Sequence, residues 1–286
     1  MYERILNFLI RNNFQRLNII LFKVFKFFLK KKIVLNFLKY KFYAYPQRKE
    51  MSRWMIKHLK IWDKRDIEII INQIKNDNTI FIDIGCNYGA YSIPIAKLKN
   101  KINVYCIDPS EKALNQLKDN IKLNDIKNIE YFKIGVGEKN KNAFFNDEIK
   151  NYKNSGSYEI SNKYSGKKIL IDSIDNLIEN GKIIPKKKII VKMDVEGYEF
   201  LALQGMIQTI KRYDVFIFFE FSIKIVLNHD DLLTAFTKFL KENNLKIFNS
   251  EFYEVKIEDL FYEVKHLPKN IEVVGNYILS KNVNFN

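Results

Sequence analysis

The sequence predicts an α/β fold with a mostly parallel sheet covered by helices on both faces. Strand-like and helix-like segments alternate from residue 79 onwards, which is typical of parallel strands joined by crossover helices. Residues 215–219 (VFIFF) are apolar throughout, as expected for a strand buried on both sides. Asp83 and Gly85 stand at the end of the first strand, where an open parallel sheet binds its ligands.

The individual elements follow from the apolar runs and from the start signals between them. The expected strands are residues 79–84, 102–107, 129–136, 189–193, 215–221, 245–249 and 277–280. The expected helices are residues 63–75, 90–99, 111–123, 173–179, 200–211 and 231–243. Ser110 is the expected N-cap of the third helix. Residues 137–171 are less regular, and residues 151–157 within them are expected to form a loop.

The N-terminal part differs from the rest in composition. Residues 1–45 are expected to be helical, within an extension of residues 1–62 that precedes a domain of residues 63–286. The basic side chains of this extension recur on one helical face, at Lys23, Lys26 and Lys30. One interpretation is a helix in the interface of an anionic membrane, contacted through residues 1–45. The other is a helix packed on the domain with its lysines in solvent.

Charge and cysteine content narrow the class of protein. The 286 residues carry a formal net charge of +15, which favours polyanionic partners such as nucleic acid, an anionic membrane or an acidic substrate. The 2 cysteines show neither metal-ligand spacing nor a disulfide framework. No secretory signal or uncharged membrane-spanning run is evident. We therefore expect a cytoplasmic protein, peripheral on the inner face of the membrane where the basic extension contacts it.

The first strand ends in a glycine-containing loop. Gly85 and Gly89 allow a tight turn and a close approach of the backbone to a ligand. Their Gly-x-x-x-Gly spacing differs from the dinucleotide fingerprint and from a phosphate-binding loop. Asp83, just ahead of the first glycine, suits a cationic ligand, and S-adenosylmethionine carries both an ammonium and a sulfonium group. The alternative is a purely structural strand-to-helix turn.

Acidic residues follow two other strands. Asp108 comes directly after the second strand and can accept hydrogen bonds from ribose hydroxyls, or else cap the following helix. Asp194, Glu196 and Glu199 surround Gly197 after the fourth strand. Because an apolar strand delivers these three acids to the edge of the sheet, we favour a functional role over a solvated charge run.

Taken together, these segments resemble the FkbM family of methyltransferases. The matching segments are IDIGCNYGAYS at 82–92, CIDPS at 106–110, the Ser-x-Ser of Ser155 and Ser157, LIDSIDNLI at 170–178 and IIVKMDVEGYEFLALQGM at 189–206. The resemblance covers roughly residues 65–281 and leaves out residues 1–60. It implies the class I methyltransferase fold, a Rossmann-like, mostly parallel seven-stranded sheet with its last strand antiparallel. It also implies methyl transfer from S-adenosylmethionine to oxygen, commonly to a hydroxyl of a sugar or a polyketide-like molecule.

Carried over by position, the family's motifs give roles to individual residues. The implied cofactor-binding residues are Asp83, Gly85, Cys86, Asn87, Tyr88, Gly89, Asp108 and Asp194. The glycine loop lines the methionine portion, Asp108 takes the ribose, and the acidic motif that begins at Asp194 lies beside the methyl donor. The family more usually has Glu at position 108, and the shorter Asp should still reach the ribose.

Methyl transfer to a hydroxyl requires alignment of the reacting groups and removal of the hydroxyl proton. Glu196 or Asp194 is the expected base, with Glu220 and His229 as competitors. The candidate substrate-binding residues are Ser155, Ser157, Glu199 and His229. The acids could instead hold a divalent metal through oxygen ligands, but no second ligand cluster is evident, and we expect no metal.

Three functions compete on these grounds. The first is methylation of a sugar hydroxyl in a surface glycan or in its lipid- or nucleotide-linked precursor. The second is RNA methylation, suggested by the positive charge, but the basic residues lie on a Phe-rich helix rather than on a base-stacking platform. The third is a cofactor-binding interaction module without catalysis. The intact glycine and acid positions argue against the third, and we expect a small-molecule or glycan acceptor rather than nucleic acid.

Overall fold

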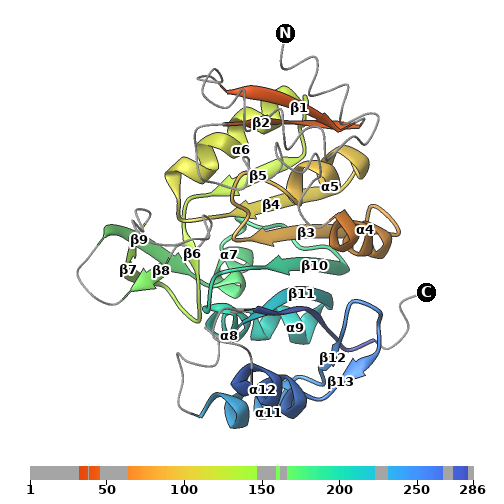
Figure 1. The fold of residues 1–286 in the computed structure, drawn as a ribbon, viewed down its shortest axis with the longest axis vertical. Coiled ribbons are helices and arrows are strands. Elements are labelled where there is room, and N and C mark those ends of the chain that lie inside the picture. Colours follow the sequence, from red (N-terminus) through yellow and green to blue (C-terminus); the bar gives the residue numbers. More distant parts are fainter. Residues whose placement is uncertain are drawn as a thin grey trace.

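The computed structural model describes residues 32–37, 39–45, 64–146, 159–161, 166–222, 231–266 and 273–282. An eight-stranded sheet forms the centre of this described part, with the order β13-β12-β14-β11-β10-β3-β4-β5 (Figure 1). Its strands are β3 (Thr79–Ile84), β4 (Asn103–Ile107), β5 (Ile129–Phe132), β10 (Lys188–Met193), β11 (Asp214–Ser222), β12 (Lys246–Phe248), β13 (Glu254–Val255) and β14 (Val273–Ser280).

The strand directions confirm the predicted fold class. Strands β11, β10, β3, β4 and β5 are parallel to one another. The last strand, β14, is antiparallel to both β11 and β12. This is the class I methyltransferase arrangement that the sequence predicts. The two-residue strand β13 extends the sheet beyond the seven expected strands.

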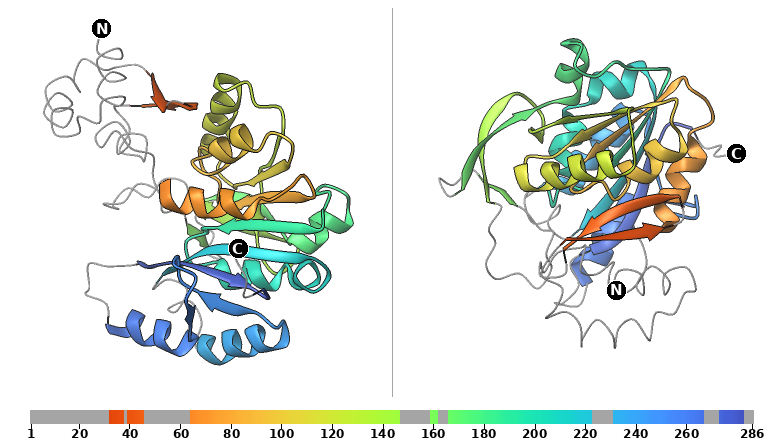
Figure 2. Two further views of the ribbon diagram at one scale, coloured as in Figure 1. Left: turned by 90° about the vertical axis from the view of Figure 1, so that its right-hand side faces the viewer. Right: turned by 90° about the horizontal axis from the view of Figure 1, so that it is seen from above.

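Helices cover both faces of the sheet, as predicted (Figure 2). The helices on one face are α4 (Lys64–Gln73), α5 (Ser92–Leu98) and α6 (Glu111–Leu123). The helices on the other face are α7 (Ile174–Glu179), α8 (Glu199–Gln204), α9 (Ile207–Arg212), α11 (Leu232–Glu242) and α12 (Ile257–His266). Successive side chains of a strand point to opposite faces, so Phe81 packs with the first group and Ile82 with the second.

Residues 200–211, expected to form one helix, form α8 and α9 instead. The two helices meet at Gly205, where the chain passes very close to a neighbouring segment. A Cβ atom at Gly205 would lie 1.9 Å from the carbonyl oxygen of Gly137. The break therefore occurs where backbone packs directly on backbone.

The residues between β5 and α7 in the sequence form a second, four-stranded sheet, which lies at the left of Figure 1. Its strands are β6 (Gly135–Val136), β7 (Lys141–Asn146), β8 (Glu159–Ser161) and β9 (Lys167–Asp172), in the order β6-β9-β7-β8. The prediction of one strand over residues 129–136 is thus wrong, and the span expected to be less regular, residues 137–171, contains strands in its described parts. The loop expected at residues 151–157 lies outside the described residues. The chain leaves the central sheet after Phe132 and joins the second sheet at Gly135, and the polar residues of the new strands hide their pattern.

Residues 33–44 are not helical but form an antiparallel hairpin of β1 (Ile33–Phe37) and β2 (Tyr40–Ala44). The physical reason is a period of two: Ile33, Leu35, Phe42 and Ala44 are the buried positions. The buried side chains belong to the same apolar core as α5 and α6. The predicted lysine stripe at 23–30, and the rest of residues 1–31 and 46–62, lie outside the described residues.

The hairpin is fixed to the domain by side chains of α6. Asn120 Oδ1 accepts a hydrogen bond from the Tyr43 amide at 2.8 Å, and Asn124 Oδ1 accepts one from the Lys41 amide at 2.7 Å. Asn120 also donates to the Tyr88 carbonyl at 2.9 Å. The hairpin, α6 and the loop after β3 are therefore tied together. No helix among the described residues is long and apolar enough to cross a membrane.

Candidate cofactor and active site

The carboxyl ends of β3, β4, β10 and β11 meet at one edge of the sheet, because these strands are adjacent and parallel. This edge carries an unusual number of acidic side chains. They are Asp83, Asp108, Asp194, Glu196, Glu199 and Glu220. The structure thus gathers six acids that are scattered over more than a hundred residues of sequence, all of them proposed above from strand ends.

Asp83 lies one residue before the end of β3 and is completely buried. Its Oδ2 accepts a hydrogen bond from the Ser92 hydroxyl, and the Cys106 thiol contacts that hydroxyl at 3.0 Å. Its other oxygen, Oδ1, has no hydrogen-bond partner among the described residues. Burial raises the pKa of Asp83, while nearby Lys192 and the Ser92 hydroxyl act in the opposite direction.

Lys192 lies directly beside Asp83 in the parallel register of β3 and β10. Its ammonium is 3.0 Å from Asp194 Oδ2 and 5.0 Å from the ring centroid of Tyr91, and its side chain is only 8% exposed. Burial by itself would lower the pKa of Lys192, but the carboxylates of Asp194 and Asp83 outweigh that effect and raise it. Sequence reasoning assigned no role to this residue, although a lysine inside an apolar strand was the available signal.

The loop after β3 is held by its backbone. The amides of Gly85 and Cys86 both donate to the Ile107 carbonyl, at 2.9 and 3.2 Å. Gly85 has a φ of 77°, and a Cβ atom there would lie 1.9 Å from the Asp194 carbonyl oxygen. Only glycine therefore lets the loops after β3 and β10 pack together, so this residue has a structural role whatever ligand binds.

The remaining residues of the loop point in different directions. Cys86 and Tyr88 are buried in the apolar core, where the Tyr88 ring packs edge-on against Phe42 at 5.8 Å. Asn87 is partly exposed and has a positive φ of 48°. Gly89, with a φ of 88°, is buried against the Leu117 side chain. Of the five loop residues from Gly85 to Gly89, Gly85 and Asn87 are partly exposed and the other three are buried.

Asp108 is buried at the end of β4, with both carboxylate oxygens engaged by backbone. Oδ2 accepts from the Asn87 amide at 2.9 Å, and Oδ1 accepts from the Ser110 amide at 2.8 Å. Burial raises the pKa of Asp108 to about 6. The N-cap of α6 is Ser110, as predicted, since its hydroxyl accepts from the Ala113 amide at 3.2 Å. Asp108 thus links the first two strand ends and does not itself cap the helix.

Glu199 organises the loop after β10. Its Oε1 accepts from the Val195 amide and its Oε2 from the Gly197 amide, both at 2.9 Å. Burial raises the pKa of Glu199 to about 7. Between these anchors Glu196 is held at a φ of 54°, a conformation that costs a non-glycine residue about 1 kcal/mol or more. Glu199, proposed above as substrate-binding, is enclosed in its own loop, whereas Glu196 is partly exposed.

Glu220 stands near the end of β11, beside Asn276 of β14. Burial, followed by the negative charges of Asp194 and Glu196, raises the pKa of Glu220 to about 9. This side chain therefore holds a proton at neutral pH. Burial is the main physical cause of the shift, and the neighbouring acids add to it.

Three residues of the predicted site, Ser155, Ser157 and His229, lie outside the described residues. The acids of the LIDSIDNLI segment are described and have structural roles. Asp172 accepts from the Asn176 side chain at 2.8 Å. Asp175 accepts from the amide and hydroxyl of Thr209, at 2.7 and 2.6 Å, and so caps the start of α9. Among the described residues, no three His, Cys, Asp or Glu side chains converge in a way that could hold a metal ion.

The sequence of this domain matches a known family. A model of the methyltransferase FkbM domain matches residues 83–244, more than half of the chain. The chain belongs to the FkbM family of methyltransferases. The matched region begins at Asp83 and includes every acid at the strand ends, so the FkbM domain and the acidic edge coincide.

The chain is also similar to other proteins. A stretch of 56 residues is 36% identical to the tRNA(Phe) (4-demethylwyosine(37)-C(7)) aminocarboxypropyltransferase of Methanocaldococcus jannaschii, covering 20% of this chain and 22% of that protein. The methyltransferase FkbM structure from Methylobacillus flagellatus is 17% identical, with a TM-score of 0.44, over 71% of this chain and 44% of that one. The TYW2 structure from M. jannaschii, solved with AdoMet, is also 17% identical, with a TM-score of 0.41, over 88% of each chain.

The cofactor of the FkbM domain is S-adenosylmethionine, and the residues at the strand ends fit this molecule. Its ammonium and sulfonium groups are cationic, and the carboxyl groups of Asp83, Asp108, Asp194 and Glu220 all interact electrostatically with Lys192, the nearby cation of the chain. The buried Asp83 Oδ1 atom has no hydrogen-bond partner in the described part of the chain, and such an atom is stabilised by a donor or a cation. Burial raises the pKa values of Asp108, Glu199 and Glu220, and a cation bound beside them would favour their ionised forms.

Proposed function

We propose that the chain transfers a methyl group from S-adenosylmethionine to a sugar hydroxyl, in a surface glycan or in its lipid- or nucleotide-linked precursor. The observation that carries the methyl-transfer part is the acidic edge, where strained Glu196 lies between two backbone amides fixed by Glu199. Strained backbone is concentrated at functional sites. The sugar acceptor rests on the family resemblance and on the oxygen chemistry that this resemblance implies.

The cofactor would be held by the loops after β3 and β4. The partly exposed residues Gly85 and Asn87 would line it. Asp108, which already binds the Asn87 amide at 2.9 Å, would accept the ribose hydroxyls with its remaining lone pairs. Asp83, whose Oδ1 atom has no hydrogen-bond partner among the described residues, would stabilise the positive charge of the cofactor. When bound, S-adenosylmethionine supplies an electrophilic methyl group.

The chain's own task is to orient the acceptor hydroxyl and to take its proton. Glu196 is the proposed base because it is partly exposed and rigidly presented. Asp194 is instead engaged in an ion pair, since the Lys192 ammonium lies 3.0 Å from its carboxylate. Glu220 already holds a proton at neutral pH, since its pKa is about 9. Glu220 is therefore better suited to donate a hydrogen bond to the acceptor than to act as the base.

Replacing Glu196 with Gln tests this assignment. The amide keeps the size of the side chain but cannot take a proton, so turnover should fall by about 100-fold or more. Transfer of labelled methyl from S-adenosylmethionine to a panel of nucleotide-linked and lipid-linked sugars measures turnover, and calorimetry measures cofactor binding, which should change little. Glu138→Gln, at an exposed surface position, is the matched control. Unchanged turnover in the Glu196 variant would contradict the assignment.

RNA methylation is a second candidate function. It is favoured by the formal net charge of +15 and by the short similarity to a tRNA-modifying enzyme. The same labelled-methyl assay with total RNA in place of the sugars distinguishes the two. Transfer to RNA and not to any sugar would replace the first proposal. Cofactor binding without transfer to either pool would instead favour a non-catalytic module.

We also propose that the N-terminal segment contacts an anionic membrane. Because residues 33–44 form a hairpin on the domain, this role falls to the part before it, with Lys23, Lys26 and Lys30. Co-sedimentation with vesicles containing anionic lipid should be lost when these three lysines are replaced by Glu. Binding that survives the triple replacement would contradict the membrane contact.

A further inference from the structure

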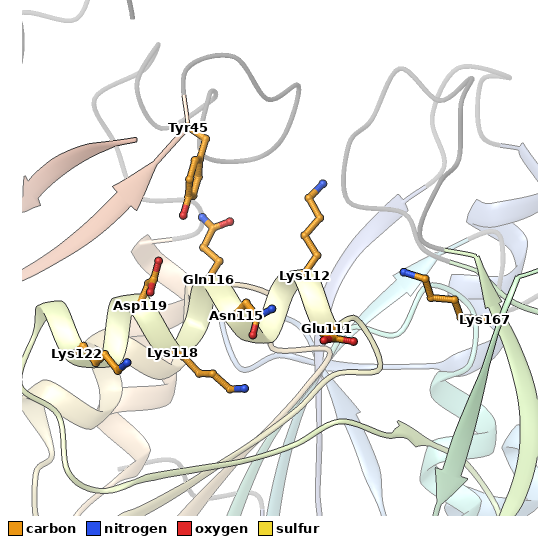
Figure 3. A pocket seen from close by; sticks show the side chains of 9 residues that line it. All are labelled: Tyr45, Glu111, Lys112, Asn115, Gln116, Lys118, Asp119, Lys122 and Lys167. Atoms are coloured by element: carbon orange, nitrogen blue, oxygen red, sulfur yellow. The ribbon is translucent and has the colours of Figure 1, made fainter. Parts of the chain in front are cut away.

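A groove runs along the outer side of α6, between the hairpin and the second sheet (Figure 3). Its volume is about 560 Å³. The lining residues are Tyr45, Glu111, Lys112, Asn115, Gln116, Lys118, Asp119, Lys122 and Lys167. In Figure 3, Tyr45 extends from the end of β2 toward α6, and Lys167 extends from β9 toward the same helix. Three separate parts of the chain therefore build this groove.

The groove is basic. Lys112, Lys118 and Lys122 come from α6 and Lys167 comes from β9, against two acids in the lining. Each acid is bound by a lysine from outside the lining. Lys32 contacts Asp119 at 2.7 Å, and Lys133 contacts Glu111 at 3.3 Å. The lining thus carries four lysines against two acids, and this excess of positive charge should attract an anion.

Size favours a small anion over a polynucleotide. A volume of about 560 Å³ is within the usual range of pockets for small molecules and cofactors. From Lys112 to Lys122 the helix extends about 15 Å, at 1.5 Å per residue. A single-stranded nucleic acid is normally held by a row of aromatic side chains on which bases stack, whereas the aromatic residue of this lining is Tyr45. A ligand with one or two phosphates matches both the charge and the dimensions.

The groove begins next to the cofactor site. Asp108 binds the amide of Ser110, and Ser110 caps the helix whose first turn carries Lys112. Lys112, at one end of the groove, therefore follows the proposed ribose-binding residue Asp108 by four positions, on the first turn of α6. A molecule bound there could extend toward the acidic edge, where Glu196 lies.

We infer that this groove binds the diphosphate group of the methyl acceptor, so that the acceptor is a sugar carried on a diphosphate. The inference rests on the proposed function for the nature of the reaction. A nucleotide-linked sugar and a lipid-linked sugar share this diphosphate chemistry. Lys112 and Lys167 would hold the diphosphate from two sides, and the sugar would reach the acidic edge.

Binding of uridine diphosphate and of inorganic pyrophosphate, measured by calorimetry without cofactor, tests the groove independently of methyl transfer. Both should bind, and Lys112→Ala with Lys167→Ala should weaken binding about tenfold or more, as expected when two charged contacts are lost. Lys238→Ala with Lys241→Ala, on α11, removes the same charge at a remote surface and is the matched control. It should leave both affinities within about twofold.

Failure of either diphosphate to bind at about 1 mM, a weak affinity, would overturn the inference, as would equal losses in the two double variants. Tighter binding of a short single-stranded RNA that the groove variants abolish would also overturn it, in favour of nucleic acid. Methyl transfer to a uridine-diphosphate sugar against a short polyprenyl-diphosphate sugar then distinguishes the two carriers. Because binding is read without transfer, diphosphate binding with no methylated sugar would contradict the proposed function and leave the groove assignment intact.

Discussion

The loops after β3 and β10 leave neighbouring parallel strands, yet they are stabilised in opposite ways. The first loop is fixed from outside, because Gly85 and Cys86 donate to Ile107 of the next strand. The second loop is fixed from inside, because Glu199 accepts two amides of its own loop. The first buries apolar side chains and the second collects acids. One loop therefore serves as a scaffold for binding, and the other presents ionisable groups.

The two loops also depend on each other. Gly85 of the first loop packs against the Asp194 carbonyl of the second. Lys192 of β10 lies beside Asp83 of β3 and forms an ion pair with Asp194, which follows β10. A change at this contact should disturb both loops, whereas a change inside one loop should affect that loop alone. The following predictions test this difference.

Gly85→Ala should have the largest effect. The new Cβ atom would lie 1.9 Å from a backbone oxygen, at a φ of 77°, so strain and overpacking add to about 3–5 kcal/mol of lost stability. Cofactor binding should be lost as well. Thermal unfolding and calorimetric binding of S-adenosylmethionine measure the two effects.

The matched control for this change is Gly181→Ala. Gly181 has a φ of 68°, but nothing lies within 4 Å of the added Cβ atom. It should therefore lose only about 1 kcal/mol, the cost of a left-handed alanine. If the two alanine variants lost equal stability, the close contact between the loops would not be what requires glycine at position 85.

Glu199→Gln should have a smaller and more local effect. An amide side chain offers one acceptor oxygen where the carboxylate offers two, so one of the bonds to Val195 and Gly197 is lost. The expected destabilisation is about 1–3 kcal/mol. Turnover should fall because Glu196 is no longer held in place, while cofactor affinity should stay near that of the parent.

Comparison of kcat with cofactor affinity checks this prediction. Glu263→Gln, on the surface of α12, provides the control for a lost carboxylate. Loss of cofactor binding in step with turnover would show that the loop after β10 is not separable from the loop after β3, contrary to the comparison above.

The sequence predicts the parts of this site that depend on local pattern. Apolar runs reveal the strands, and the acids that follow them, such as Asp108 and Asp194, then fall at one edge because the strands are parallel. Lys192 is different, since its role depends on its register beside Asp83, which no local pattern contains. The close approach of Gly85 to Asp194 is hidden for the same reason.

The errors in the fold have a related cause. Residues 33–44 are so rich in apolar side chains that a period of two is easily taken for a helix, and only the buried set of Leu35 and Phe42 reveals the strands. The second sheet is built from strands such as KNAFFN and KKILID, in which lysine and asparagine break the apolar run. Such strands are stabilised by their partners rather than by their own pattern.

The last prediction concerns pH and Glu220, and the size of its effect depends on the pH at which stability is measured. Burial and the charges of Asp194 and Glu196 raise the pKa of Glu220 from 4.5 to about 9. Between these values the folded chain keeps a proton that the unfolded chain has released, so the free energy of unfolding falls as pH rises, by at most about 1.4 kcal/mol per pH unit. Glu220→Gln removes this dependence, because an amide does not ionise. The variant should therefore gain stability relative to the parent chain as the pH increases from 6 toward 9.

Denaturant unfolding at several pH values within that window measures the difference. Glu242→Gln, at an exposed position near the end of α11, should give a curve parallel to that of the parent chain. A Glu220→Gln curve that also stays parallel would mean that burial and the neighbouring acids do not keep Glu220 protonated in the folded chain. Convergence of the two curves at low pH and divergence at high pH would instead show that the loop after β10 stores unfavourable charge in the absence of a cation. S-adenosylmethionine should then stabilise the parent chain more at high pH than it stabilises the variant.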